Sequence, residues 1–347
     1  MAQTFEPARL ATNNPARTVF IPVGLLAGAF LLSVAVGAVF IPFHEMLAVF
    51  TRGQVSSDAY SSILMKVRLP HTVLILLTGA ALGGSGAAYQ GLFRNPLADP
   101  YLIGVASGAS LGAVFAMSAG WPVGLLGFYA IPVAAFVGSL LTVFIVYSLA
   151  RVGKTVPATT MILAGVAVSS FATSPTSFMM LRSSGELHRA ISWLMGGGTM
   201  GGWEPVLASL PYTLLGLGVL LVSSGHALNV LQFGDEQAHN LGLHVERTKF
   251  ILIVSASLAT AAAVSFSGVI GFVGLIIPHG VRILWGQDYH RIIPLSIAGG
   301  AGMLLVADAI ARTVLAPQVL PVGIITALAG APFFLWLLRG VRNQAFG

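Results

Sequence analysis

The 347-residue sequence contains no cysteine and few charged residues, and both absences narrow what the protein can be. Without cysteine the chain has no disulfide framework and no thiolate metal site. Charged residues make up 8% of the chain, about a third of the share usual in soluble proteins. A soluble protein needs polar residues to cover its surface, so the composition argues against a soluble enzyme, a disordered chain and a nucleic-acid-binding domain.

Long apolar runs occupy most of the chain, of which 56% is hydrophobic. A membrane-spanning helix needs about 20 mostly apolar residues. The sequence therefore predicts an all-α polytopic membrane protein with about ten transmembrane helices, in one transmembrane domain over residues 1–347 that begins with a cytoplasmic tail over 1–18. The runs are Val19–Phe40, Leu69–Ala88, Leu102–Met117, Val123–Leu149, Ala158–Met180, Val206–Val222, Phe250–Phe266, Val269–Trp285, Ile292–Ile310 and Leu320–Leu338.

The basic residues are scattered singly between these runs, which is typical of loop ends in a membrane protein and not of a nucleic-acid-binding surface. With ten spans and a cytoplasmic N-terminus, most of the 17 Lys and Arg residues lie on the inner side. The distribution predicts a multi-pass membrane protein with both termini in the cytoplasm, and the resemblance described below implies that the membrane is the bacterial inner membrane.

Small residues at helical spacing predict how the spans pack, because lipid-embedded helices associate through close backbone contact. Gly79 and Gly83 share one face of the second run, and Gly104, Gly108 and Gly112 share one face of the third. Two further features interrupt runs. We expect a break at Ser267–Gly271 and the end of an apolar stretch at Pro278–Gly280; either a tight hairpin or a transport pathway explains such breaks.

No catalytic or metal site stands out. Gly153–Thr155 resembles the end of a phosphate-binding loop, but the earlier glycine of that motif is replaced by Ser148 and an apolar run precedes it. His239 and His244 lack metal-ligand spacing. Asp308 is the one acidic residue placed inside a span, and Arg312 one turn later is expected to pair with it. With so few intramembrane acids the chain has little means of coupling to protons, so an external energy source is expected.

The polar segment 234–249 mixes charged residues with apolar ones, as short amphipathic helices do. Partner docking and a simple solvated loop both remain open for it.

Several segments, taken in order along the chain, resemble the permease subunits of type II ABC importers for iron chelates, haem and cobalamin in bacteria. The similar segments are Arg68–Pro70, Gln90–Pro100, Gly104–Ala109, Leu163–Ala167, Gly271–His279 and Leu320–Phe334. The resemblance implies a type II ABC importer permease fold that forms a homodimer. It implies two cytoplasmic ATPase subunits, which use ATP and Mg, and a periplasmic substrate-binding protein as partners. The chain itself is then no enzyme and binds no cofactor, no metal and no nucleic acid.

The resemblance also assigns two docking surfaces. It places the ATPase-docking loop at 234–249, with Asp235, Glu236, Leu241, Gly242, Val245 and Arg247 as the contact residues. It places the docking of the binding protein on outward-facing cations at Arg68 and Arg312. Where the family commonly has a second arginine three residues after Arg68, this chain has His71, and Lys66 is expected to compensate. The alternative for Arg68 is a helix-end side chain that snorkels to the membrane surface.

The translocation path of the family lies between two subunits, along the fifth span and the short helix that follows it. The resemblance places an inner gate at Ala158, Thr159, Thr160 and Met161, and further path residues at Met179, Arg182 and Met195. Methionine suits an irregular, greasy cargo, although core filling explains each methionine equally well.

Together these features predict an importer that moves an iron complex, haem or a ferric siderophore, from periplasm to cytoplasm by alternating access. Cobalamin is the alternative substrate within the same family. Outside that family, an ion-coupled secondary transporter and a membrane-embedded enzyme or scaffold are the remaining possibilities.

Overall fold

A computed structural model describes residues 15–37, 41–51, 58–119, 127–182, 185–198 and 201–345. Within these ranges the chain is helical and contains no strand beyond one isolated bridge between Val152 and Thr155. The helical elements are α1 (Pro15–Ala35), α2 (Phe43–Thr51), α3 (Asp58–Ile63), a π-helical turn η1 (Leu64–Arg68), α4 (Leu69–Leu92), η2 (Pro100–Ile103), α5 (Val105–Ser118), η3 (Gly127–Tyr129), α7 (Ala130–Ala150), α8 (Ala158–Arg182), α9 (Leu187–Leu194), α10 (Glu204–Leu231), α11 (Asp235–Asn240), α12 (Val245–Ser267), α13 (Val273–Trp285), α14 (Tyr289–Thr313) and α15 (Val322–Ala345).

Every predicted apolar run overlaps one of these helices, but the helices differ in length. Six are long and apolar enough to cross a membrane, and four shorter apolar helices within α1, α5, α13 and α15 coincide with the remaining runs. The number of crossings therefore stays a prediction. Most of the expected tail over residues 1–18 lies outside the described residues, and α1 begins at Pro15, inside that tail.

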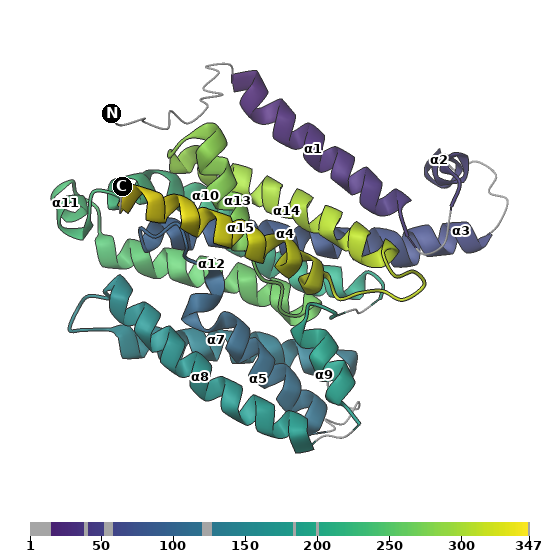
Figure 1. The fold of residues 1–347 in the computed structure, drawn as a ribbon, viewed down its shortest axis with the longest axis horizontal. Coiled ribbons are helices and arrows are strands. Elements are labelled where there is room, and N and C mark those ends of the chain that lie inside the picture. Colours follow the sequence, from purple (N-terminus) through teal and green to yellow (C-terminus); the bar gives the residue numbers. More distant parts are fainter. Residues whose placement is uncertain are drawn as a thin grey trace.

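Helix α4 forms the centre of the molecule and packs along α14 (Figure 1). The contact depends on the absence of side chains at the predicted glycine stripe. A Cβ atom at Gly79 would collide with the backbone of Gly300, and one at Gly83 would collide with the backbone of Ser296. The two helix backbones therefore touch, as expected where lipid provides no hydrophobic force between helices.

Helices α5 and α7 pack in the same way. Cβ atoms at Gly108 and Gly112 would strike the backbones of Gly138 and Ala134 on α7. Gly104 does not belong to this stripe, contrary to the expectation from spacing. It precedes α5 with a φ of +88°, a left-handed conformation that ends η2 and starts α5.

The predicted break at Ser267–Gly271 is confirmed as a non-helical stretch between α12 and α13. It is buried in protein, and the hydroxyl of Tyr101 donates to the carbonyl of Ile270 at 2.9 Å and accepts the Ile270 N–H at 3.1 Å. Irregular backbone at membrane depth requires such partners. Pro278–Gly280 lies inside α13, which continues to Trp285, the predicted end of that run.

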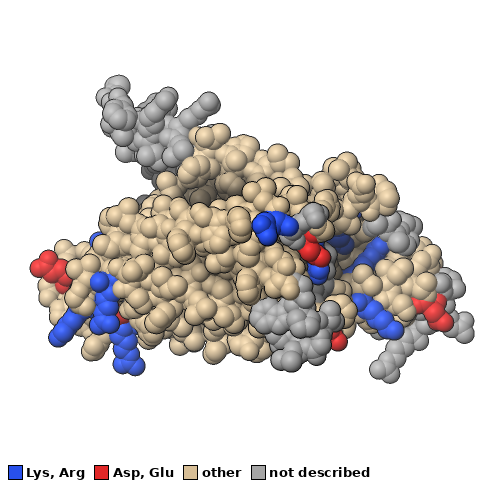
Figure 2. All heavy atoms as spheres, turned by 90° about the horizontal axis from the view of Figure 1, so that it is seen from below, with Lys and Arg blue, Asp and Glu red and all other residues tan. Residues whose placement is uncertain are grey.

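The helices run along the longest axis of the molecule, so the chain has two distinct ends (Figure 1). The end that carries α11 also carries the C-terminal end of α15, and the opposite end carries α2, α3 and α9. On the face shown in Figure 2, charged side chains gather at one end and in the opposite half, with an uncharged belt between them. This distribution fits a protein whose middle lies in lipid.

The α4–α14 contact makes a quantitative prediction. Replacing Gly83 with alanine forces the backbones apart, and we expect a loss of about 1–3 kcal/mol in unfolding free energy, the usual cost of overpacking. The measurement is reversible unfolding in detergent micelles. Gly218→Ala on α10 is the matched control, because no atom lies within 4 Å of its added Cβ; it should be neutral or stabilising. Equal effects of the two substitutions would contradict the close contact.

Candidate functional site

Helix α8 presents an exposed polar face although its length and composition suit a membrane span. Among the six long apolar helices of the described residues, α8 has the lowest share buried inside the chain, 22%, whereas the span that contains α4 has 89%. The exposed residues at spacings of three and four include Ser170, Thr173, Ser174 and Ser177. Three of these hydroxyls donate to carbonyls one turn earlier, at 2.9 Å for Ser170, 2.8 Å for Thr173 and 3.2 Å for Ser174. Their exposed oxygens still make this row more polar than the apolar surface that lipid favours.

A shallow groove of 520 Å³ lies where α8 meets η2 and is lined by Tyr101, Leu102, Val166, Ser169, Ser170 and Thr173. Asp99 fixes this corner by accepting the Tyr101 N–H at 2.8 Å as the N-cap of η2. Burial raises the pKa of Asp99 to about 6, although the hydrogen bond from Tyr101 opposes the shift. The groove therefore has a rigid wall on η2 and a polar wall on α8.

The four predicted gate residues lie at the first turn of α8. Thr159 is exposed, Ala158 is half-buried, and the Thr160 hydroxyl donates to the carbonyls of Ala150 and Pro157, both at 2.9 Å. Met161 is 1% exposed and belongs to the main apolar core. Of the two explanations for this methionine, the structure fits core filling.

The three path residues predicted beyond the gate lie at the other end of α8 and just after α9. Arg182 ends α8 and is exposed, and Met179 is half-buried. Met195 is 45% exposed, and its carbonyl accepts the Gly323 N–H at 3.0 Å. This backbone bond ties the end of α9 to the start of α15.

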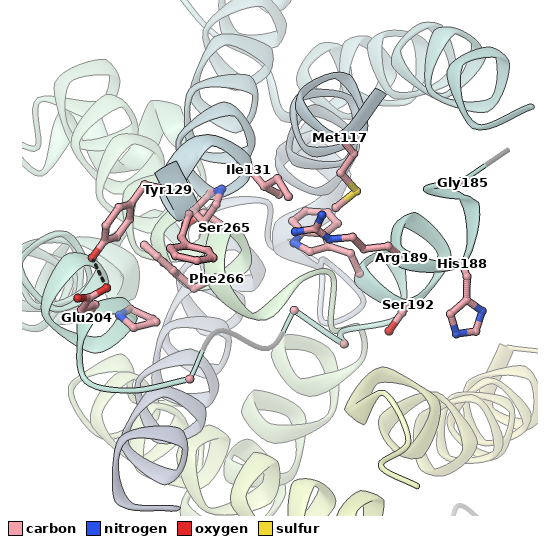
Figure 3. Close-up of a pocket in the computed structure, with 17 residues that line it drawn as sticks. Met117, Tyr129, Ile131, Gly185, His188, Arg189, Ser192, Glu204, Ser265 and Phe266 are labelled. Carbon is pink, nitrogen blue, oxygen red and sulfur yellow. Dashed lines mark hydrogen bonds between the residues drawn. The ribbon is translucent and has the colours of Figure 1, made fainter. Parts of the chain in front are cut away.

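A larger pocket of 870 Å³ lies behind α9, between it and α5, α7, α10 and α12. Figure 3 shows Arg189 and Ser192 of α9 on one side and Tyr129 with Glu204 on the other. The Tyr129 hydroxyl donates to the Glu204 carboxylate at 3.4 Å. Helix α9 therefore borders open space, although its Ala190 and Trp193 are buried in one apolar cluster with residues of α5 and α12.

The segment 234–249 contains α11 and the first turn of α12, in agreement with short helices broken near Gly242, whose φ is +87°. Asp235, Glu236, Leu241 and Arg247 are exposed, whereas Val245 is buried. Leu241 is 67% exposed, and Phe233, just before the segment, is 66% exposed. Phe233 is not among the predicted contact residues, because it stands at the end of an apolar helix. An apolar pair amid charges at the tip of the molecule is typical of a protein-binding surface.

Arg68 and Arg312 lie close to the C-terminal end of α1, and both are buried, at 5% and 9% exposed. The Arg68 guanidinium donates to the carbonyls of Val34 and Ala35 at 3.3 and 3.0 Å. Arg312 donates to the carbonyls of Val36 and Ser33 at 2.9 and 3.0 Å. Cations near the C-terminus of a helix satisfy its last carbonyls and its dipole. Lys66, in contrast, is exposed.

The predicted pair of Asp308 and Arg312 is confirmed, with Arg312 Nε 2.8 Å from the carboxylate. The second carboxylate oxygen lies 2.9 Å from Nε2 of His71. The contact between His71 and Asp308 could not be predicted from local spacing, because the two residues lie 237 positions apart. His71 therefore joins the Arg68–Arg312 region through Asp308.

Comparison with known proteins agrees with the family resemblance found in the sequence. A profile of the FecCD transport family matches residues 25–340. The chain is 47% identical over 82% of its length to the cobalamin import system permease protein BtuC of Halobacterium salinarum, covering 75% of that protein. It is 40% identical over 84% of its length to the hemin transport system permease protein HmuU of Yersinia pestis, covering 87% of it. An inward-facing solved structure, of a transporter described as metal-chelate ABC type, aligns with a TM-score of 0.82 and 29% identity over 94% of this chain and 99% of that chain.

Asp308 should be essential for stability. Asp308→Asn leaves the buried Arg312 without a counter-ion, and we expect a loss of about 3–5 kcal/mol in unfolding free energy. Unfolding in detergent micelles measures it. Glu186→Gln is the control, because its pair with Arg189 is exposed and such pairs contribute at most about 1 kcal/mol. If Asp308→Asn proved as mild as the control, the buried pair would not hold α1 in place.

Proposed function

Because the chain belongs to the FecCD transport family, we propose that it is the membrane subunit of an ATP-driven importer that carries an iron complex into the cell. Members of this family are ABC transporter permeases for iron chelates or cobalamin, and the multi-pass helical fold agrees with that role. We further propose that the α11 end faces the cytoplasm and the α9 end faces outward, and that the chain resides in the bacterial inner membrane.

The hydroxyl face of α8 is the observation that supports this proposal best. The exposed hydroxyls of Ser170, Thr173, Ser174 and Ser177 suit a polar neighbour better than lipid, although the first three already donate to carbonyls within the helix. A second copy of the chain, related by a two-fold axis, brings two such faces together and encloses a polar path. The groove between α8 and η2 then lies along the wall of that path.

The segment 234–249, together with Phe233, is the proposed site for the ATPase subunit. Leu241 and Phe233 offer apolar anchors, and Asp235, Glu236 and Arg247 supply a charged rim. ATP and Mg act in that partner. Movement at this surface then reaches the first turn of α8, where Ala158, Thr159 and Thr160 form the inner gate.

The periplasmic binding protein is proposed to dock at the α9 end around Lys66, Arg68, His71 and Arg312. Lys66 is the exposed member of this set and offers its charge directly. Arg68 and Arg312 hold the end of α1 and so shape the surface from below.

An iron complex with acidic groups fits the outer rim of the path. Arg182 ends α8 on the exposed side, where it can pair with a carboxylate of haem or of a ferric siderophore. Cobalamin has amide groups at its periphery and gains less from this cation. The 47% identity to a cobalamin permease keeps cobalamin as the second candidate.

An ion-coupled mechanism would need an acid that can bind and release ions inside a span, and Asp308 is the acid that the predicted runs contain. Asp308 is buried, and its two oxygens are engaged by Arg312 and His71. The carboxylate is thus committed to structure, so an external source of energy is expected.

The energy source is testable with the chain reconstituted in vesicles. Chelate should accumulate only when the ATPase subunit and ATP are both present, and an ionophore should not abolish it. Leu241→Asp should reduce co-purification of the ATPase subunit by about tenfold, because it places a charge at an apolar anchor worth about 1.4 kcal/mol or more. Leu241→Met, which keeps an apolar side chain, should bind normally. Accumulation by the chain alone would refute the proposed function.

The substrate class is testable by a panel of haem, ferric siderophores and cobalamin, each loaded on the binding protein and scored by stimulation of ATPase activity. We expect an iron complex to stimulate most. Arg182→Gln should weaken transport of the anionic complex by about 5–30-fold, as expected for one charge-assisted hydrogen bond of about 1–2 kcal/mol, and leave transport of cobalamin unchanged. Stimulation by cobalamin alone would identify the second candidate.

A further inference from the structure

Lys249 is a buried cation near the start of α12, at 5% exposed, and its partners lie on three different segments. Its ammonium donates to the carboxylate of Asp235, the first residue of α11, at 2.6 Å. It also lies 3.5 Å from Glu246 on α12 and 3.4 Å from the carbonyl oxygen of Val156 in the loop between α7 and α8. A lysine ammonium has three donors, and here each has an acceptor.

Val156 is held by its backbone on both sides. Its carbonyl accepts from Lys249, and its N–H donates to Glu246 Oε2 at 3.0 Å. The side chain of Val156 is also buried. The position of this residue therefore follows the first turn of α12, whatever the rest of the loop does.

Only one residue, Pro157, separates Val156 from Ala158, the first residue of α8. The pyrrolidine ring fixes the φ angle of Pro157, so this link has little slack. On the other side of Val156, residues 152–155 close a tight turn through the bridge of Val152 and Thr155. A displacement of Val156 is thus passed to α8 and not absorbed by the loop.

The same lysine reaches the exposed surface through Asp235, whose side chain is 49% exposed. Asp235 stands at the start of α11, between Phe233 and Leu241, the apolar anchors of the proposed ATPase surface. Burying the ammonium of Lys249 is costly unless its hydrogen bonds are satisfied, and an apolar side chain would fill the same space without that cost. Packing alone therefore does not explain a lysine at this position. The polar contacts form a continuous chain from the partner surface to the gate helix.

We propose that Lys249, Glu246 and Asp235 form a clasp on the backbone of Val156 that transmits movement of the α11–α12 segment to the inner gate. The inference rests on the proposed function, and it names the positioning residues that couple ATP use to gate movement. Lys249 acts through Val156 and touches neither nucleotide nor cargo. Because the acceptor on the α8 side is a backbone carbonyl, the coupling is independent of the side chain at 156.

The absence of cysteine allows a direct test in the complete complex with its ATPase and binding-protein partners. Thr159→Cys places one thiol on the exposed gate turn, and its rate of labelling by a maleimide is measured with and without ATP. In this background ATP should change the rate. Adding Lys249→Met should abolish that change. It should also lower the amount of chelate imported per ATP hydrolysed by about tenfold, which lies within the range typical of coupling between two sites, about 5–150-fold. ATP hydrolysis itself should continue.

Matched variants separate coupling from folding. Lys249→Arg should restore coupling, because a guanidinium reaches the same acceptors. Lys154→Gln changes an exposed cation in the adjacent turn and should alter nothing. Glu246→Leu removes the acceptor of the Val156 N–H at a more exposed position and should uncouple as Lys249→Met does, which keeps the test decisive if Lys249→Met fails to assemble.

Two failures are distinguishable. An unmodified complex that neither hydrolyses ATP nor imports chelate contradicts the proposed function and, with it, the clasp. A working complex in which Lys249→Met or Glu246→Leu stays fully coupled overturns the clasp alone.

Discussion

Direct contact between helix backbones is the constraint on which the rest of this structure depends. Lipid is as apolar as the helices themselves, so the helices gain stability by approaching closely and not by hiding apolar surface. Gly79 and Gly83 allow this contact between α4 and α14, and Gly108 and Gly112 allow it between α5 and α7. A dense centre built in this way leaves α8 at the edge, where its polar face stays open. The same close glycine contacts thus explain both the tightly packed centre and the exposed position of α8.

Buried cations join the segments that glycine contacts do not reach. Arg68 and Arg312 bind carbonyls at the end of α1, and Lys249 binds a carbonyl in the loop before α8. In each case a long side chain from one helix satisfies backbone oxygens of a distant segment. Such hydrogen bonds fix the position of the distant segment as well as stabilise it, because the acceptor is part of the main chain.

Local features of the sequence predicted much of the fold. The lipid thickness imposes length and apolarity on each span, so run lengths alone locate the long helices. The Gly79–Gly83 spacing and the Asp308–Arg312 pair lie within one or two helical turns, and both behave as expected. The break at Ser267–Gly271 followed from its glycines.

Features set by distant partners escaped prediction. The carbonyls that receive Arg68 stand more than 30 positions earlier, and Val156 stands 93 positions before Lys249. Met161 was ambiguous because α8 is apolar on several sides near it, so periodicity does not say which side faces the core. Local pattern determines elements, whereas tertiary partners determine where polar side chains point.

The guanidinium groups at the end of α1 have a consequence for recognition outside the membrane. Both groups already donate hydrogen bonds to carbonyls of residues 33–36, at the end of that helix. An anion that binds these guanidinium groups competes with the carbonyls at the end of α1 for the same N–H donors. If the anion wins, the last turn of α1 loses these hydrogen bonds. Binding of an anion at this surface and the order of the last turn of α1 are therefore linked, because both depend on the same N–H groups of Arg68 and Arg312.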